Sequence, residues 1–469
     1  MDLTHPITAA DLLPKIDRMW EHSASKIRSI ESVYDGSSGA PVFTVEGKYT
    51  ARGWTDWTEG FIYGSSILQF DATGESSFLD LGRKHTVERM PAHVTHVGVH
   101  DHGFNNVSTF GNLLRLMKEG KIPEDVWQRN YNELALMTSG AVQATRWTSI
   151  PDGGYVYSFN GPHSLFSDTI RSMRALAVAH MLGHTLRGEQ DQKVSLLARM
   201  IAHIEATLQY NVYYGENRDG YDVAGRVVHE SIFNPNNGDY RCPSTQQGYS
   251  PFSTWTRGLA WVMCGCAEQL EYLQIIGDDE LDQLGGRASV EAMLLRAARV
   301  TCDFYIESAA AACGIPYWDT GAPGLVYLKD WTNRRADPFN DYEPVDSSAA
   351  AIAAQGLLRL GHYLDAATEG AKYWQAGLKV VDTLLGDLYL STDPQHQGLL
   401  LHGVYHWPNH WDHVPSGKKI ACGESVMWGD YHLRELALYV SRVARSEEYL
   451  TFFNIASSDE VMPQKQTKL

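Results

Sequence analysis

The segment 97–104 concentrates groups that could carry out acid–base chemistry. His100, Asp101 and His102 place two imidazoles and a carboxylate at three consecutive positions, with a glycine on either side. Burying such a cluster is costly unless its members are paired or take part in a reaction. The glycines let the backbone bend and a ligand come close. Because a helical pattern follows directly, we predict a functional loop that leads into a helix, with a satisfied polar turn as the alternative.

A second carboxylate, Asp168, stands at the start of another predicted helix. It could simply cap that helix. It also follows Leu165 and Phe166, and an apolar neighbourhood raises the pKa of a carboxyl group, as a general acid requires. Asp101 and Asp168 are therefore the two candidate catalytic residues.

Residues suited to holding a sugar ring occur later in the chain. His229 is followed by a stretch in which Gln247, Arg257 and Trp261 lie close together at the entrance of a helix. The guanidinium fork of arginine matches a carboxylate, and tryptophan offers an apolar face to a sugar. The alternative is that the tryptophans belong to the core and that Arg257 caps a neighbouring helix.

Three further polar motifs follow. Asp346, with two serines after it and then an alanine-rich stretch, is typical of a helix N-cap, and we interpret it as mainly structural. His402 lies in a second histidine-containing motif, and Ser416 and Lys418 form a Ser-x-Lys element, which is more often simply a solvated loop.

No metal or cofactor is expected. His93, His96, His100 and His102 are dense, but there is no HExxH motif and their spacing matches no zinc pattern. The six cysteines form no CxxC pair, and we interpret them as reduced thiols of a cytoplasmic protein.

Composition narrows the class of partner. The chain has 469 residues and a formal net charge of −17, which disfavours non-specific binding to nucleic acid or to an anionic membrane. No stretch approaches 18 uninterrupted apolar residues, and the first residues do not resemble a signal peptide, so no membrane span is expected. Aromatic residues make up 11% of the chain, which suits a carbohydrate cleft as well as an ordinary large core.

Helical periodicity dominates the elements that must position these residues. It predicts twelve helices, near residues 10–31, 54–70, 75–90, 106–119, 123–146, 165–186, 193–211, 254–275, 287–309, 347–363, 367–387 and 425–446, and only a few short strands. Paired into six hairpins and closed into a ring, they make an all-α (α/α)6 barrel whose loops line a cleft at one end. An open helical solenoid is the alternative. No linker divides residues 1–469, so we predict one domain, with an N-terminal helical segment and a short, disordered C-terminal tail at about 455–469.

The order of these motifs resembles glycoside hydrolase family 88, the unsaturated glucuronyl hydrolases, and more weakly the unsaturated rhamnogalacturonyl hydrolases of family 105. The resemblance covers roughly four fifths of the chain. It rests on Trp57-Thr-Glu-Gly-Phe61, His100-Asp-His-Gly-Phe104, the segment ending at Asp168, Gln247-Gly-Tyr-Ser250, Trp255-Thr-Arg-Gly-Leu-Ala-Trp261, Asp346-Ser-Ser-Ala-Ala-Ala-Ile352 and Trp428-Gly-Asp-Tyr431.

This resemblance implies an (α/α)6 barrel and a substrate that ends in a 4-deoxy-4,5-unsaturated uronic acid. Asp168 would protonate C4 of the enol ether and then assist the addition of water at C5, while Asp101 would hold the sugar hydroxyls and tune the proton on Asp168. His229 and Gln247 would lie around the ring and the attacking water. Trp57 would stack on the ring, and Arg257 would bind near the uronate or the leaving sugar.

The resemblance also implies supporting roles and some departures. His100 would be a neighbour of the catalytic pair, and Ser416 and Lys418 resemble an element that some members use for sulfated substrates. Gln246 replaces the family's usual histidine, Leu259 its glutamine, and His102 an apolar residue, which puts the choice of leaving sugar in doubt.

Three other functions stay open: an unsaturated rhamnogalacturonyl hydrolase, an inverting glycosidase that acts on saturated glycans, and a carbohydrate-binding protein without activity. No cofactor is implied, the partner is an oligosaccharide, and the protein is expected to be a monomer or a homodimer.

Overall fold

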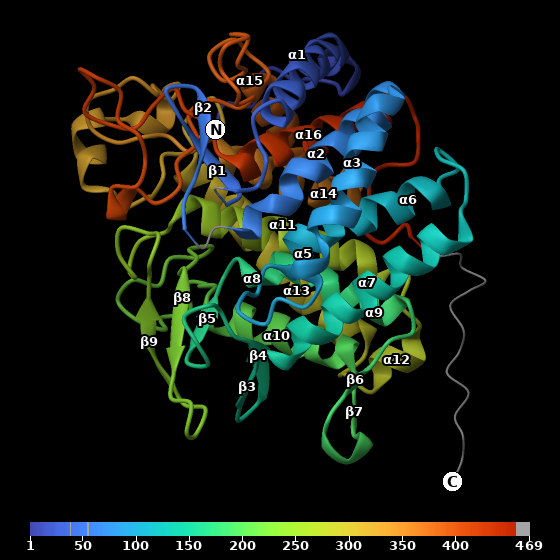
Figure 1. The fold of residues 1–469 in the computed structure, drawn as a ribbon. Coiled ribbons are helices and arrows are strands. Elements are labelled where there is room, and N and C mark those ends of the chain that lie inside the picture. The colour runs from blue at the N-terminus through green and yellow to red at the C-terminus, as the bar shows by residue number, and fades with distance from the viewer. Residues whose placement is uncertain (38, 54–55, 456–469) are drawn as a thin grey trace.

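The computed structural model describes residues 1–37, 39–53 and 56–455, and helices dominate this part of the chain (Figure 1). The long helices among the described residues form two concentric layers. The inner layer consists of α2 (Glu59–Thr73), α5 (His102–Asn106) continued through a π-helical turn (Val107–Gly111) into α6 (Asn112–Lys118), α8 (Thr169–Ser172) with α9 (Arg174–Met181), α11 (Thr256–Leu273), α14 (Ser347–Tyr363) and α16 (Met427–Ala444). The outer layer consists of α1 (Leu13–Glu31), α3 (Ser76–Arg89), α7 (Val126–Thr145), α10 (Leu196–Tyr210), α13 (Arg287–Phe304) and α15 (Ala371–Leu384).

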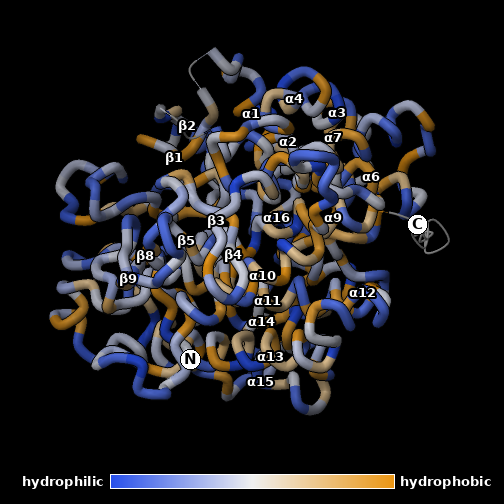
Figure 2. The backbone as a smooth tube through the Cα atoms, turned by 90° about the horizontal axis from the view of Figure 1, so that it is seen from below, coloured by the Kyte–Doolittle hydropathy of each residue, from blue (hydrophilic) through white to orange (hydrophobic). Residues whose placement is uncertain are grey.

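The difference between the layers follows from their sequences. Every residue of α11 is buried, and α14 and α16 are buried along nearly their whole length, as expected for helices without a polar face. The outer helix α1 instead buries one stripe that includes Ile16, Met19, Trp20, Ile27 and Ile30. In Figure 2, α11 and α14 lie near the middle of the molecule, while hydrophilic loops run around its edge.

The ring closes between the two ends of the chain. The last inner helix, α16, packs against both α2 and α1. The predicted N-terminal helical segment is therefore the outer partner of α16 and completes the sixth hairpin. This confirms the (α/α)6 barrel and excludes the open solenoid. The tail predicted to be disordered begins at about residue 455, and residues 456–469 lie outside the described residues.

Strands are few and short in the described ranges, as predicted. They are β1 (Pro41–Val45) paired with β2 (Lys48–Ala51), β3 (Trp147–Ile150) with β4 (Gly153–Val156), β6 (Leu186–Arg187) with β7 (Lys193–Val194), and a three-stranded sheet of β5 (Ser164–Phe166), β8 (Glu230–Phe233) and β9 (Tyr240–Ser244). All the pairs are antiparallel. Two very short helices, α4 (Pro91–Val94) and α12 (Asp278–Asp282), lie in connections.

One predicted helix, 165–186, has the wrong bounds. Its first residues form β5, the helix begins at Thr169, and it ends at Met181. A short apolar run does not distinguish a buried strand from a helix, and the partner strand β8 lies far downstream in the sequence. The structure also shows no helix, in the part of the chain it describes, that is long and apolar enough to cross a membrane.

The inner helices begin at the same end of the barrel. Trp57, just before α2, stacks on Trp428 at the start of α16, with 5.1 Å between ring centroids. Arg257 at the start of α11 forms an ion pair with Asp346, which precedes α14. The strands β1, β2, β5, β8 and β9 and the long loops gather on this side, at the left of Figure 1. We refer to it as the loop end.

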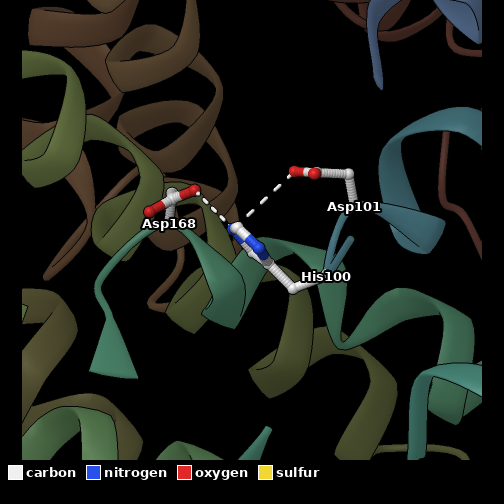
Figure 3. A group of neighbouring side chains, drawn as sticks. All are labelled: His100, Asp101 and Asp168. Carbon is white, nitrogen blue, oxygen red and sulfur yellow. Dashed lines mark hydrogen bonds and ion pairs between the residues drawn. The ribbon is translucent and has the colours of Figure 1, made fainter. Parts of the chain in front are cut away.

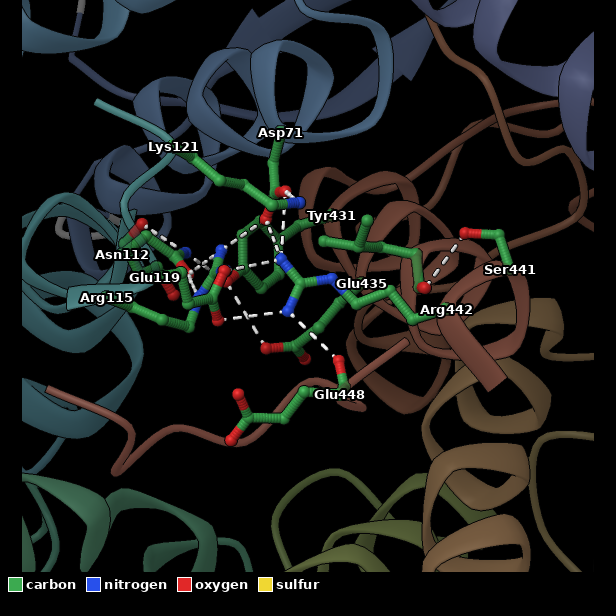
Figure 4. Close-up of polar contacts among 12 residues, drawn as sticks. Asp71, Asn112, Arg115, Glu119, Lys121, Tyr431, Glu435, Ser441, Arg442 and Glu448 are labelled. Carbon is green, nitrogen blue, oxygen red and sulfur yellow. Dashed lines mark hydrogen bonds and ion pairs between the residues drawn. The ribbon is translucent and has the colours of Figure 1, made fainter. Parts of the chain in front are cut away.

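At the end of the barrel opposite the loop end, buried ion pairs join the inner helices α2, α6 and α16 (Figure 4). Asp71, near the end of α2, pairs with Arg115 of α6 at 2.7 Å and with Arg442 of α16 at 2.8 Å. It also pairs with Lys121, and Glu119 bridges the two arginines at 2.9 and 2.7 Å. The Asp71 side chain is fully buried. A buried ion pair contributes little by itself, but removing one partner leaves the other charges uncompensated.

We expect Asp71→Asn to lower the free energy of unfolding by about 3–5 kcal/mol at neutral pH, because the buried guanidinium groups of Arg115 and Arg442 lose a shared carboxylate partner. Burial alone would raise the pKa of Asp71, but these cations hold it far below its usual value. The stabilisation is therefore present above about pH 4 and is lost as the pH falls further, because the unfolded chain then binds a proton that the folded chain does not.

Urea unfolding of both forms between pH 7 and pH 3 tests this expectation. The difference between the two forms should shrink as the pH falls. Asp80→Asn, at an exposed position on α3, serves as the matched control. An Asp71→Asn protein as stable as the original at pH 7 would mean that the network does not hold the barrel together.

Candidate active site

Asp101 is placed by a close contact between two inner helices. It precedes α5, and Gly103 follows two residues later. A Cβ atom at Gly103 would lie 2.3 Å from the carbonyl oxygen of Ser172 in α8, so only glycine fits there. The Gly103 N–H donates to the Ser172 hydroxyl at 3.0 Å. From the sequence we expected this glycine to let the backbone bend and a ligand come close. In the structure it lets α5 and α8 touch, which brings Asp101 toward Asp168.

The side chain of Asp168 does not cap its own helix. Instead, its Oδ2 atom lies 3.2 Å from Nε2 of His100, which in turn lies 3.8 Å from Oδ1 of Asp101 (Figure 3). One ligand atom from each residue lies within 4.8 Å of the others. The three side chains form what we call the His–Asp–Asp cluster, and they are nearly completely buried. Such a group could hold a metal ion, and the expectation that no metal is needed stays a prediction.

Charges within this cluster move the pKa values in different directions. Burial alone would lower the pKa of His100, but Asp101 and Asp168 outweigh it and raise that pKa. Burial would raise the pKa of Asp168, yet the hydrogen bond and the charge of His100, followed by His229, lower it. Burial raises the pKa of Asp101, and the charge of Asp168 adds to this. The raised pKa that the sequence led us to expect at Asp168 thus belongs, in the free protein, to Asp101.

His229 faces Asp168 from the other side. Its Nδ1 atom accepts hydrogen bonds from the backbone N–H groups of Gln246 and Gln247, at 3.1 and 3.3 Å. In the neutral ring the proton must therefore sit on Nε2. That atom lies 3.9 Å from Oδ1 of Asp168, and burial lowers the pKa of His229. His229 thus presents an N–H donor to the Asp168 carboxylate.

Arg257 is committed to the protein rather than directed into open space. Its Nη1 donates to Asp346 at 2.6 Å and also to the carbonyl oxygen of Val404. Its Nη2 donates to Oε1 of Gln247 at 2.9 Å and to the carbonyl oxygen of Tyr405 at 2.7 Å. Arg257 therefore orients Gln247 by its amide oxygen, which leaves the NH₂ group of Gln247 as the donor. Direct binding of a uronate by Arg257 stays a prediction.

Asp346 confirms its interpretation as a cap. Its Oδ1 accepts from the backbone N–H groups of Ser348 and Ala349 at 3.0 and 3.3 Å, at the start of α14. Its second oxygen holds Arg257. The buried carboxylate of Asp346 thus caps α14 and orients Arg257 of the neighbouring helix α11.

An aromatic layer lies beside the cluster. Trp57 contacts Phe104 and Trp428, with ring centroids 6.3 and 5.1 Å away, and it remains partly exposed. Trp261 is only 3% exposed and packs against Phe104 and His432. Trp57 is thus open to a ligand, whereas Trp261 supports the layer from within. The substrate-binding roles predicted for both stay predictions.

Three predicted binding residues make their contacts elsewhere. The ring nitrogens of His402 bond to backbone groups, with Nε2 donating to Leu388 at 3.1 Å and Nδ1 accepting from Gly423 at 2.9 Å. Ser416 and Lys418 lie on an exposed turn, and the Lys418 ammonium lies over the ring of Phe339. The structure does not bring these residues into the His–Asp–Asp cluster, and their binding roles stay predictions.

Sequence reasoning missed two residues at the site. Tyr405, whose hydroxyl lies 3.5 Å from Nε1 of Trp57, belongs to the same motif as His402, and its aromatic ring was the available signal. Arg146 donates to the carbonyl oxygens of Val97, Tyr157 and Ser158 and so fixes the loop that precedes His100. Nothing in its local sequence indicated this role.

His102, the unusual residue of the first motif, is structural. Its Nε2 donates to the carbonyl oxygen of His96 at 2.9 Å, and its Nδ1 lies 2.9 Å from the hydroxyl of Ser139. Burial lowers the pKa of His102 to about 4, so the ring is neutral at physiological pH. Its presence therefore leaves the charge of the cluster unchanged.

Comparison with known proteins supports the resemblance seen in the motifs. No family model matches the chain. An unsaturated glucuronyl hydrolase from Formosa agariphila is 25% identical over 386 residues, covering 81% of this chain and 78% of that protein. Another from a Bacillus species is 27% identical over 409 residues, covering 84% and 89%. A solved unsaturated glucuronyl hydrolase specific for heparin superposes with a TM-score of 0.70 at 17% identity, covering 92% and 98%. The resemblance to these enzymes is confirmed, and so is their barrel fold.

We expect His100→Ala to raise the pKa of Asp168 above its usual value, because His100 provides the interactions that offset burial. Carbon-13 NMR titration of labelled aspartate carboxyl groups measures this pKa, and the Asp168→Asn spectrum assigns the signal. His163→Asn, which changes a neighbouring histidine outside the cluster, is the control. An unchanged Asp168 pKa in His100→Ala would show that His100 does not set its charge.

Proposed function

We propose that this chain, a relative of the unsaturated glucuronyl hydrolases, is itself such a hydrolase, of glycoside hydrolase family 88. It releases a 4-deoxy-4,5-unsaturated uronic acid from the non-reducing end of an oligosaccharide produced by a polysaccharide lyase. The observation that carries the proposal is the buried pair Asp101 and Asp168, joined through His100 where the inner helices begin. The relatives of the same name, aligned over most of the chain, support it.

The proposed reaction is a hydration. Asp168 delivers a proton to C4 of the enol ether, and positive charge develops at C5 and the ring oxygen. A water molecule adds to C5 while the Asp168 carboxylate takes up one of its protons. The resulting hemiketal opens, and the leaving sugar departs with its oxygen protonated. One carboxyl group acts first as acid and then as base, so it ends in its starting state.

In this proposal, substrate binding raises the pKa of Asp168, whose ionised form is favoured in the free protein. The pKa of Asp168 is lowered while His100 is its main neighbour. A uronate carboxylate brought into this dry site adds a negative charge, and a like charge raises the pKa of a nearby carboxyl group. The two aspartates then titrate as a pair, so that Asp101 tunes the proton that Asp168 transfers.

Two facing polar atoms support a position for the attacking water. Oδ1 of Asp168 and Nε2 of His229 are buried and lie 3.9 Å apart. A separation of this size suits a bridging water, which would donate to Asp168 and accept from His229. In this proposal Gln247, through its NH₂ group, and Trp57 would hold the sugar.

The inverting-glycosidase alternative is disfavoured by distance. Inverting enzymes keep their two carboxyl groups roughly 6.5–9.5 Å apart so that a water fits between them. Here the cluster brings carboxylate oxygens of Asp101 and Asp168 within 4.8 Å. Hydration, which needs a single proton-transferring residue, agrees with that short separation.

The proposed cellular location, domain organisation and partners rest on the cysteines and on the composition. All six cysteines are free thiols, and five of them are buried, which supports a reducing, cytoplasmic location. We further propose that residues 1–469 act as one catalytic domain, as a monomer or a homodimer. Neither nucleic acid nor membrane is a partner in this proposal, which rests on the acidic composition.

The first test follows the ultraviolet absorbance of the conjugated enol ether during incubation with a panel of lyase-generated unsaturated disaccharides. We expect the absorbance to decay with at least one of them. We expect Asp168→Asn to slow that decay by at least about 10²- to 10⁴-fold, because the proton donor is lost.

Asp80→Asn is the matched control and should retain full activity, since it exchanges the same groups at an exposed site. Circular dichroism confirms folding of each variant. A folded, fully active Asp168→Asn protein would refute the role of Asp168, and release of reducing sugar from saturated glycans alone would favour the other hydrolase class.

A further inference from the structure

Asp319 is a fully buried carboxylate that has no part in the reaction proposed above. It lies in the long connection between α13 and α14 and forms an isolated antiparallel bridge with Trp255, the residue before α11. The backbone N–H of Thr256 donates to the carbonyl oxygen of Trp318 at 3.1 Å beside this bridge. The backbone of Asp319 is therefore fastened to the start of α11, at the loop end of the barrel.

The side chain of Asp319 accepts two backbone hydrogen bonds. Its Oδ2 atom accepts from the N–H of Tyr249 at 2.9 Å, and its Oδ1 atom accepts from the N–H of Gly321 at 2.8 Å. Tyr249 belongs to the segment 245–249, which we call the Gln247 loop, whereas Gly321 belongs to the same connection as Asp319. The carboxylate thus ties the Gln247 loop to the connection between α13 and α14.

Gly248 allows the Gln247 loop to lie this close to Asp319. A Cβ atom at Gly248 would lie 3.1 Å from Oδ2 of Asp319 and only 2.7 Å from Oγ1 of Thr245, so a larger residue would push the loop away. The Thr245 hydroxyl accepts a hydrogen bond from the Gly248 N–H at 2.9 Å. The loop is thus held from within by Thr245 and from outside by Asp319.

The Gln247 loop and Trp255 are both neighbours of the His229 ring. The ring centroids of His229 and Trp255 lie 4.7 Å apart. Nδ1 of His229 accepts from the N–H groups of Gln246 and Gln247, both in the loop. Asp319 therefore holds two neighbours of this histidine, one through its backbone and one through its side chain.

We propose that Asp319 is a positioning residue for His229, and that by holding the Gln247 loop and Trp255 it keeps the proton of the neutral imidazole on Nε2, where it faces Asp168. This inference rests on the proposed function, in which a water between His229 and Asp168 attacks the substrate. When the loop N–H groups do not point at Nδ1, a neutral imidazole can carry its proton on either nitrogen. Half of the rings would then offer no donor to Asp168 or to the water.

The kinetic test uses an unsaturated disaccharide that the protein hydrates, at pH 8. Burial raises the pKa of Asp319 to about 6, so its carboxylate is ionised at that pH. We expect kcat to fall about 10- to 100-fold in Asp319→Ala, because small displacements beside the reacting atoms have effects of this size. KM should stay within about threefold, because Arg257 holds the side chain of Gln247 independently at 2.9 Å.

Two further variants separate this role from a general effect on the fold. Asp341→Asn changes an exposed aspartate of the same connection and should leave kcat and KM unchanged. Thr245→Val removes the hydrogen bond within the Gln247 loop but leaves Asp319 in place, so it should lower kcat in the same direction. It also serves as the test if Asp319→Ala does not fold, as judged by circular dichroism.

A spectroscopic measurement follows His229 itself. Long-range proton–nitrogen NMR spectra of histidine-labelled protein at pH 8 show which ring nitrogen carries the proton, and His229→Gln assigns the signals. We expect one form, protonated on Nε2, in the original protein and a mixture of both forms in Asp319→Ala and in Thr245→Val. An unchanged His229 signal in these folded variants would overturn the proposal, whether or not kcat falls.

The NMR comparison needs no substrate and so keeps this inference distinct from the proposed function. A mixed His229 signal in Asp319→Ala supports the positioning of His229 by Asp319 even if the original protein hydrates no unsaturated disaccharide, and that second result would count against the proposed function alone. A mixed signal together with an unchanged kcat would show that the proton position on His229 does not matter for the reaction, and would overturn the positioning role in catalysis.

Discussion

The site depends on one geometric constraint: the inner helices of the barrel begin side by side. A helix start leaves backbone N–H groups without partners and carries a partial positive charge, so it attracts carboxylates. Asp101, Asp168 and Asp346 occupy the residue before α5, α8 and α14. Only Asp346 uses its side chain to cap its helix, while the other two turn to His100. Asp101 and Asp168 therefore do not cap a helix, although they stand at the same position as Asp346, and this leaves their carboxylates available for chemistry.

The helix starts stay together because the barrel is closed. Buried ion pairs between inner helices help to hold that barrel together. Arg171 pairs with Glu268 of α11 at 2.8 Å and with Glu435 of α16 at 2.9 Å, so these charges join three inner helices about one turn beyond Asp168. The network around Asp71 joins α2, α6 and α16 at the far end. Pairs of this kind are costly to form and more costly to break, so they favour one arrangement of the helices over looser packings.

The sequence predicted the fold well because inner and outer helices differ in periodicity, and periodicity is a local property. It singled out Asp101 and Asp168, which the structure brings together at His100, because carboxylates in apolar surroundings are unusual; their catalytic role stays a prediction. It could not show that Phe166 belongs to a strand, since the partner Glu230 lies far downstream. It also could not show that both ring nitrogens of His402 bond to backbone groups or that Arg257 is shared between Gln247 and Asp346, because such partners depend on the three-dimensional fold. Residue type indicated which groups could act, while contacts decide which are free to do so.

An acidic protein that binds an acidic sugar must keep its negative charge away from the ligand. Most of the net charge of −17 is spread over the surface, and charges further than about 8 Å from a ligand are screened at physiological salt. Near Asp168 the balance differs, because His100 and His229 face its carboxylate. In the proposed reaction, the uronate of the substrate would raise the pKa of the aspartates, because a like charge disfavours their ionised forms. On this proposal, the bound substrate itself creates the conditions under which Asp168 is protonated.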